Sequence, residues 1–246
     1  MDNKLVSSLS KSDTLVFHRD DPTTRMLCKI YEGKGWDVMT ESCEPWNIDP
    51  EDLKQIFKNH SRLVFLGHGS SEGLMGMFGH EVAKYMEDKK IFAIWCNADQ
   101  YFRIHHLGKG QFITGNIPSE VWECRAAGCG NISAELMLEN ITYWATLCAE
   151  CVEECLQGRV EESVSYIRKK YLERYGNHPV SIYNACRTQC LGSSQALPKK
   201  TKFIGEKLEE KDYPCYGFDE KAFLRHPIER AFGCPHCGCK DPSFEI

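Results

Sequence analysis

Residues 63–69 read LVFLGHG and residues 91–96 read IFAIWC, so two short apolar runs each end in a reactive side chain. Runs of this length and composition are typical of buried strands in a parallel sheet. If the two strands are neighbours, His68 and Cys96 meet at one edge of the sheet. A free thiol, with a reference pKa of about 8.5, is mostly protonated near neutral pH, and a nearby imidazole is the usual means of making it a nucleophile.

Strand and helix signals alternate around these two runs. The clearest helix start is at Asp49 and Pro50, where a capping aspartate precedes a proline in the first turn. Strands are predicted at residues 13–18, 36–39 and 111–115, and helices at residues 24–33, 49–57, 79–86 and 101–107. Repeated strand–helix–strand units predict an α/β fold, a three-layer sandwich in which a mainly parallel sheet carries helices on both faces.

The pattern changes after Pro118, where helix signals replace the alternation. Long helices are predicted at residues 132–156 and 159–175, and the apolar positions of the first drift around one broad, core-facing side. We therefore expect an α/β core in residues 1–130. Residues 131–246 are expected to form a helical extension, with a cysteine-rich tail, that packs on this core.

The composition is that of an ordinary globular protein. The chain has 246 residues, of which 42% are hydrophobic and 26% charged, and its net charge of -5 offers no electrostatic footprint for nucleic acid. The sequence contains no apolar run long enough for a membrane span and no apolar stretch of a signal peptide at its start. We therefore expect a cytoplasmic protein that binds neither nucleic acid nor membrane; the oligomeric state is not predicted.

Fourteen cysteines in a chain expected in the cytoplasm are interpreted as reduced thiols, metal ligands or nucleophiles before disulfides. Three of them, Cys148, Cys151 and Cys155, lie at i, i+3 and i+7 of a predicted helix. They could share a metal ion, but small buried core side chains are the favoured interpretation.

A strand that ends in His-Gly, followed by a strand that ends in Cys, resembles the caspase-like cysteine peptidases, a group that includes caspases, legumains, gingipains, clostripain and separases. The resemblance covers residues 13–117. It implies that His68 is the proton shuttle and Cys96 the nucleophile, with Gly69 and Cys96 supplying backbone N–H groups to the oxyanion hole. Trp95 departs from the family pattern, in which a small residue commonly precedes the nucleophile.

The resemblance also implies where a peptide or protein substrate binds. In this family the end of the first strand contributes to the pocket for the residue before the scissile bond, and here that segment contains Arg19, Asp20 and Asp21. Two acids against one arginine, together with Asp99 after the nucleophile, favour a basic substrate side chain. The alternative is that Asp20 and Asp21 cap the helix that begins near Pro22. The chemistry requires no cofactor.

Two other functions fit the same residues. The sequence LGHGS at residues 66–70 is similar to the strand-end His-Gly-Ser of tetrapyrrole cobalt chelatases, although in that family the motif usually follows the first strand and here it follows the third. The other alternative is a non-catalytic signalling or interaction domain that keeps the caspase-like architecture. We favour the peptidase because a thiol and an imidazole follow successive strands.

The C-terminal tail carries a second cluster of reactive residues. Cys234 and Cys237 have the spacing of a zinc half-site, which aims two thiolates at one tetrahedral ion. A structural site needs four ligands, and Cys239, His236 and Cys215 are candidates for the remainder. A structural zinc is therefore an optional cofactor of this tail.

Overall fold

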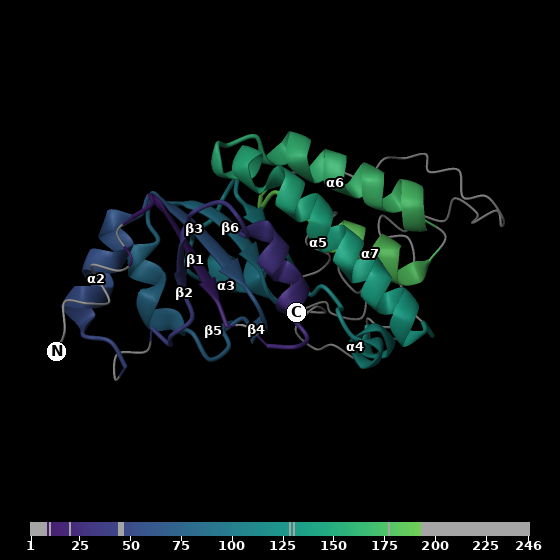
Figure 1. Cartoon of the computed structure of the whole chain (residues 1–246), viewed down its shortest axis with the longest axis horizontal. Coiled ribbons are helices and arrows are strands. Elements are labelled where there is room, and N and C mark those ends of the chain that lie inside the picture. The colour runs from purple at the N-terminus through teal and green to yellow at the C-terminus, as the bar shows by residue number, and fades with distance from the viewer. Residues whose placement is uncertain are drawn as a thin grey trace, which may run out of the picture.

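The computed structural model describes residues 9, 11–19, 21–43, 47–127, 129, 131–176 and 178–192. A five-stranded sheet runs through its centre in the order β2–β1–β3–β6–β7, and every neighbouring pair is parallel (Figure 1). Its strands are β1 (Thr14–His18), β2 (Asp37–Met39), β3 (Arg62–Leu66), β6 (Lys90–Ile94) and β7 (Phe112–Ile113). This arrangement confirms the predicted mainly parallel sheet and places the two apolar runs side by side.

The register brings the two reactive residues to the same edge of the sheet. Leu66, the last residue of β3, pairs with Ile94, the last residue of β6. His68 and Cys96 each follow two residues later, so both lie just beyond the carboxyl ends of adjacent parallel strands. A shift of the register along the strands would move one of them away from the other.

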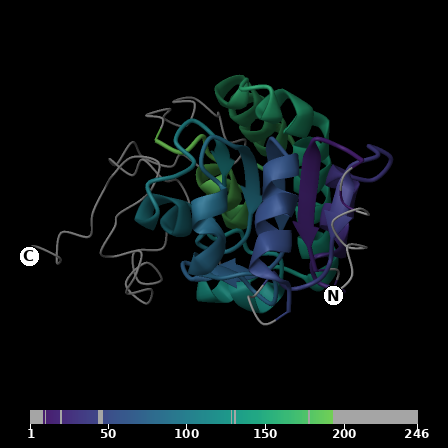
Figure 2. The ribbon, with the colours of Figure 1, turned by 90° about the vertical axis from the view of Figure 1, so that its left-hand side faces the viewer.

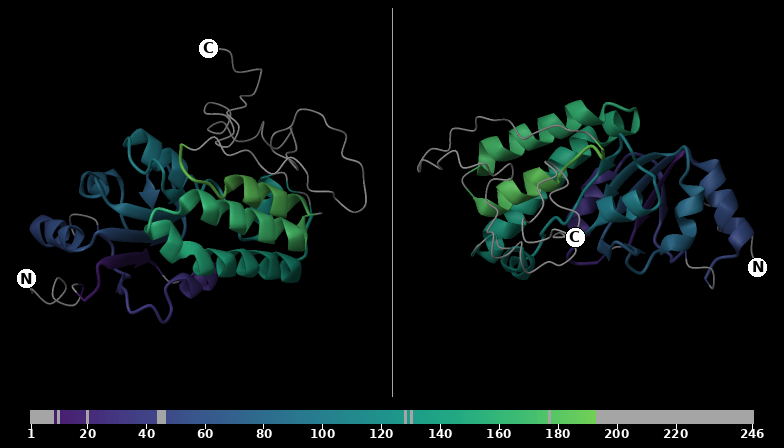
Figure 3. Two further views of the ribbon diagram at one scale, coloured as in Figure 1. Left: turned by 90° about the horizontal axis from the view of Figure 1, so that it is seen from above. Right: turned by 180° about the vertical axis from the view of Figure 1, so that it is seen from behind.

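Helices cover both faces of the sheet, because successive strand side chains point to opposite sides. Val16, Val64 and Phe92 join one core cluster, whereas Leu15, Leu63 and Ile91 join the other. Figure 2 views the molecule from the α2 side, with the green helices behind the sheet. The two views in Figure 3 also show α2 and the green helices on opposite sides. The fold is therefore an α/β sandwich of three layers.

The helical layer on one face of the sheet contains α2 (Pro50–Asn59), η2 (His80–Tyr85) and α3 (Ala98–Ile104). The helical layer on the opposite face contains η1 (Arg25–Ile30), α4 (Val121–Ala126), α5 (Ala134–Leu156), α6 (Val160–Tyr175) and α7 (Pro179–Arg187). The segments predicted as helices at residues 24–33 and 79–86 are short 3-10 helices. Asp49 caps α2 as predicted, since its side chain accepts a hydrogen bond from the Glu51 amide. Among the described residues, no helix combines the length and the apolar character that a membrane span needs.

The long helix α5 is the centre of the second helical layer. It packs on η1, β6 and α6, and its buried residues belong to the same core cluster as one face of the sheet. Cys148, Cys151 and Cys155 are among those buried residues. Their burial agrees with the interpretation of these thiols as core residues. Within the described part of the chain no three His, Cys, Asp or Glu side chains are grouped so as to hold a metal ion.

A hairpin that the sequence did not predict follows β3. Its strands are β4 (Gly69–Ser70) and β5 (Gly73–Leu74), which pair antiparallel. The Met75 amide donates a hydrogen bond to the His68 carbonyl oxygen over 2.8 Å, and Trp95 Nε1 donates to the Ser70 carbonyl oxygen over 2.9 Å. The hairpin is thereby fixed to the carboxyl edge of the sheet, next to both reactive residues.

Candidate active site

The topology predicts a binding site at the carboxyl edge between β1 and β3. The chain passes from β1 to β2 on one side and then crosses to β3 on the other, so the loops that follow β1 and β3 diverge. In open α/β sheets, ligands bind outside the carboxyl ends of the strands at such a point. Here the loop after β1 brings Asp21 and Thr23 to His68, and the adjacent strand β6 brings Cys96.

The imidazole of His68 is held by a threonine and an aspartate. Its Nε2 lies 2.6 Å from Thr23 Oγ1, and that hydroxyl donates its proton to Asp21 Oδ1 over 2.5 Å. Since a hydroxyl has one proton, Nε2 of His68 must donate to Thr23. The described contacts of the ring are made by Nε2, so this assignment leaves Nδ1 as the basic nitrogen, which can accept a proton.

Asp21 is kept ionised by the donors around it. Burial raises the pKa of its carboxyl, but hydrogen bonds from Thr23 and Thr24 outweigh burial, so the net pKa lies below its usual range. Oδ1 accepts from the backbone amides of Thr23 and Thr24, and Oδ2 from the Thr24 hydroxyl. The same contacts close the turn before η1, so Asp21 both orders this turn and anchors the residue that holds His68.

Cys96 lies on the tight turn between β6 and α3. Asn97, the next residue, has a left-handed backbone with φ of 62°, a conformation that asparagine tolerates better than most residues. This turn ends the strand abruptly and leaves the Cys96 thiol half-buried beside a cavity, whereas the thiols of α5 are buried. Cys96 thus differs from the core cysteines in its access to a ligand.

His68 and Cys96 line one small cavity of about 30 Å³. The imidazole contacts Thr23 and Asp21, and the cavity is the space that it shares with the thiol. Catalytic hydrogen bonds are often long before substrate binds. The other residues of the lining come from several elements and are mostly apolar: Thr23, Thr24, Met26, Leu27, Gly67, Ile94, Trp95, Ile117, Ser119, Ile141 and Trp144.

The contact between Gly69 and Trp95 explains how a large residue can precede Cys96. A Cβ atom at Gly69 would overlap both the Trp95 ring and the Gly73 carbonyl oxygen, so no side chain fits at this position. Trp95 is almost fully buried and packs edge-on against Phe65 and Phe78. Gly69 therefore has a packing role in addition to the oxyanion-hole role that the family resemblance implies for its amide.

The structure brings together only part of the predicted site. Arg19 is exposed, and its guanidinium lies so close to Gly76, which follows β5, that a Cβ there would overlap it. Asp99 is buried in α3, and neither residue belongs to the cavity lining. Asp20 lies outside the described residues, as do the tail residues proposed to bind zinc: Cys215, Cys234, His236, Cys237 and Cys239.

Only weak sequence signals point to the other residues of the site. The alternative that Asp20 and Asp21 cap the helix near Pro22 holds for Asp21, because its side chain accepts hydrogen bonds from the amides of Thr23 and Thr24. A cap of this type places the hydroxyls near the strand end but does not reveal the contact to His68. The lining residues Ile141 and Trp144 lie far along the chain on α5, where the periodicity shows only that they are buried.

Comparisons of the chain with protein-family models, with curated protein sequences and with solved structures find no match.

Proposed function

We propose that this protein is a cysteine peptidase, or a closely related thiol acyl-transfer hydrolase, with His68 and Cys96 as its catalytic pair. The observation that carries the proposal is their placement: each lies two residues beyond adjacent parallel strands, and both line one cavity. The topology agrees with the resemblance to caspase-like peptidases. In chain order, His68 follows the third and Cys96 the fourth strand of the sheet.

In this mechanism Cys96 Sγ attacks the carbonyl carbon of a peptide bond while Nδ1 of His68 takes the thiol proton. The imidazolium then gives that proton to the leaving amine, and water hydrolyses the thioester with His68 as the base. Backbone N–H groups of Gly69 and Cys96 are proposed to stabilise the oxyanion, a kind of contribution worth about 2.7 to 4 kcal/mol for each donor. These steps need no cofactor.

The contacts of Asp21 and Thr23 give the pair a third component. With Nε2 committed to Thr23, the ring is held in one tautomer, and the ionised Asp21 favours the imidazolium formed during the reaction. This is the orienting role that a carboxylate or amide has in other nucleophile–histidine sites. We propose that Asp21 is a positioning residue in preference to a substrate-binding one. A reducing, cytoplasmic location would keep Cys96 in the thiol form that this mechanism requires.

Labelling with thiol-directed peptide electrophiles tests the proposal. The full chain is incubated with a panel of peptidyl acyloxymethyl ketones, and the modified cysteine is identified by mass spectrometry. We expect selective modification of Cys96 and loss of labelling in Cys96→Ala, with the half-buried Cys28 as an internal control. A folded wild type that is inert to every peptide, and that hydrolyses none, would support the non-catalytic alternative. Binding of a porphyrin or metal without labelling would support the chelatase.

A further inference from the structure

We infer that the cavity beside Cys96 accepts a small, uncharged side chain of the substrate, from the residue before the scissile bond. This inference rests on the proposed peptidase function and specifies its substrate class. It replaces the preference for a basic side chain that the sequence suggests, because Asp21 accepts hydrogen bonds from Thr23 and Thr24 and Asp99 lies outside the cavity lining.

The cavity offers no charge to pair with a charged substrate. Apart from His68 and Cys96, its lining contains no titratable side chain among the described residues. The Asp21 carboxylate accepts hydrogen bonds from the Thr23 and Thr24 hydroxyls, and Asp99 is buried and does not line the cavity. A lysine or arginine side chain would therefore enter a mostly apolar space without a counter-charge, which is costly.

The polar atoms of the lining are also committed. The hydroxyls of Thr23 and Thr24 donate to Asp21, and Ser119 Oγ donates to Glu123 Oε2 over 3.0 Å. Their protons are thus not available to an acidic substrate side chain. An aspartate in the substrate would lose its hydration without gaining donors, so the cavity disfavours negative as well as positive side chains.

The size of the cavity limits the side chain further. A water molecule needs about 10 to 15 Å³ of such space, so a cavity of about 30 Å³ has room for about two groups of that size. Part of the wall is rigid. Ile141 and Trp144 are buried on α5, and Trp144 Nε1 donates to Thr188 Oγ1 over 2.9 Å. Alanine fits this space, whereas leucine or phenylalanine would require the helix to shift.

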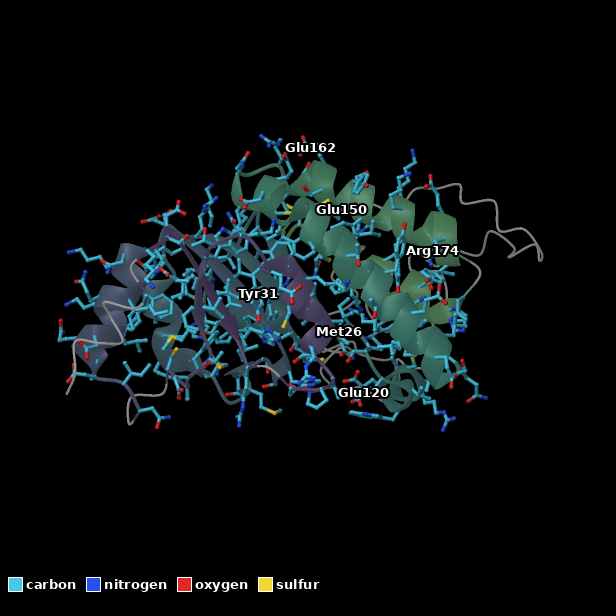
Figure 4. The ribbon with its side chains drawn as sticks, in the orientation of Figure 1. Met26, Tyr31, Glu120, Glu150, Glu162 and Arg174 are labelled. Atoms are coloured by element: carbon cyan, nitrogen blue, oxygen red, sulfur yellow. The ribbon has the colours of Figure 1, made fainter. Side chains whose placement is uncertain are left out.

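Met26 is the part of the wall that a substitution can change with least damage. It belongs to η1 and is only partly buried, and in Figure 4 it lies beside α5. An aspartate at this position would add the missing negative charge to the lining. Met75, the residue after β5, is 67% exposed and lies outside the lining, so the same change there is a matched control.

The test uses four peptidyl acyloxymethyl ketones that differ only in the residue next to the warhead: alanine, leucine, lysine or aspartate. Second-order rates of Cys96 modification are measured on the full chain by mass spectrometry. We expect the alanine reagent to react at least about tenfold faster than each of the others. If Cys96 is labelled fastest by the lysine, aspartate or leucine reagent, the inference is wrong but the peptidase proposal stands. If no reagent labels Cys96 in folded protein, both fail.

The Met26→Asp variant should raise the rate of the lysine reagent relative to the alanine reagent about tenfold, while Met75→Asp leaves the ratio unchanged. Thermal melting checks that each variant folds. Should Met26→Asp not fold, Met26→Ala provides the test, because a larger cavity should raise the relative rate of the leucine reagent. Unchanged ratios in folded Met26 variants would show that this cavity does not receive the side chain.

Discussion

Two histidine–aspartate contacts lie at opposite edges of the same sheet. At the amino edge, His60 Nε2 lies 3.0 Å from Asp37 Oδ2, and both side chains are buried. Asp37 also accepts from two backbone amides, and His60 Nδ1 contacts the Ile56 carbonyl oxygen. At the carboxyl edge, His68 Nε2 lies 3.8 Å from Asp21 Oδ1, Thr23 joins them, and about a third of each side chain is exposed.

The two contacts use the same residue types but differ in whether a ring nitrogen of the histidine stays available for proton transfer. That difference gives each site its role. Both ring nitrogens of His60 are used, one to contact α2 at Ile56 and the other to contact β2 at Asp37. His68 uses Nε2 for positioning, which leaves Nδ1 for proton transfer beside a half-buried thiol. The amino-edge contact should therefore determine stability, and the carboxyl-edge contact should determine activity.

The largest expected effect is on turnover at the carboxyl edge. Cys96→Ala and His68→Ala should each lower kcat by about 10³-fold or more, since nucleophile and base act as one unit. The double variant should be little worse than either single variant. Hydrolysis of the best peptide substrate, with circular dichroism to confirm folding, checks this. Independent, multiplicative losses would contradict the paired mechanism.

The second effect, on stability, concerns the amino edge. His60→Ala leaves the Asp37 carboxylate buried without its partner, so the free energy of unfolding should fall by about 3 to 5 kcal/mol. His68→Ala, at a partly exposed position, should lower it by less than about 1 kcal/mol. Urea denaturation measures both. The folded fraction of His60→Ala should retain the specific activity of the wild type. A large loss of stability in His68→Ala, with a loss of specific activity in His60→Ala, would contradict these roles of the two edges.

The smallest expected effects concern the link between His68 and Asp21. Thr23→Val removes the hydroxyl but keeps the shape, and we expect kcat to fall by about 100-fold with KM little changed, because the imidazole loses its orientation. Thr23→Ser, which restores the hydroxyl, should recover most of the loss. Equal activity of Thr23→Val and wild type would show that Thr23 does not position the imidazole of His68.

The lowered pKa of Asp21 gives this link a pH dependence. A carboxyl whose pKa is lowered on folding adds stability that is present above its unfolded pKa of about 3.9 and is lost as pH falls through the folded value. Asp21→Asn should therefore be less stable than wild type at pH 7, and the difference should shrink below about pH 4. Urea denaturation at both pH values measures it. A difference that is independent of pH would mean that the carboxylate charge has no part in these contacts.

Much of the fold was predictable, because it depends on local patterns. The apolar runs at residues 63–69 and 91–96 predicted two adjacent strands and the edge at which His68 and Cys96 lie. Less predictable was the role of α5. The sequence predicts a helical extension that packs on the core, but it does not show that the buried residues of α5 share one cluster with β1, β3 and β6. Periodicity shows that a helix has an apolar side, but not which element covers it.

The site was less predictable than the fold, because its contacts join residues far apart in the chain. His68 and Thr23 are 45 residues apart, and no spacing rule connects them. The overlap that a side chain at Gly69 would make with Trp95 likewise depends on the hairpin after β3, whose strands are only two residues long. Short strands of this kind carry no alternation pattern that a sequence could show.

The most direct test of the account is the effect of His68 on the reactivity of Cys96. Alkylation by iodoacetamide at pH 6.5, where an ordinary thiol is about 1% ionised, is measured for each cysteine by mass spectrometry in wild type and in His68→Ala. We predict that Cys96 reacts at least about tenfold more slowly in His68→Ala, whereas Cys28 keeps its rate. An unchanged rate at Cys96 in folded His68→Ala would contradict the central claim that the imidazole activates this thiol.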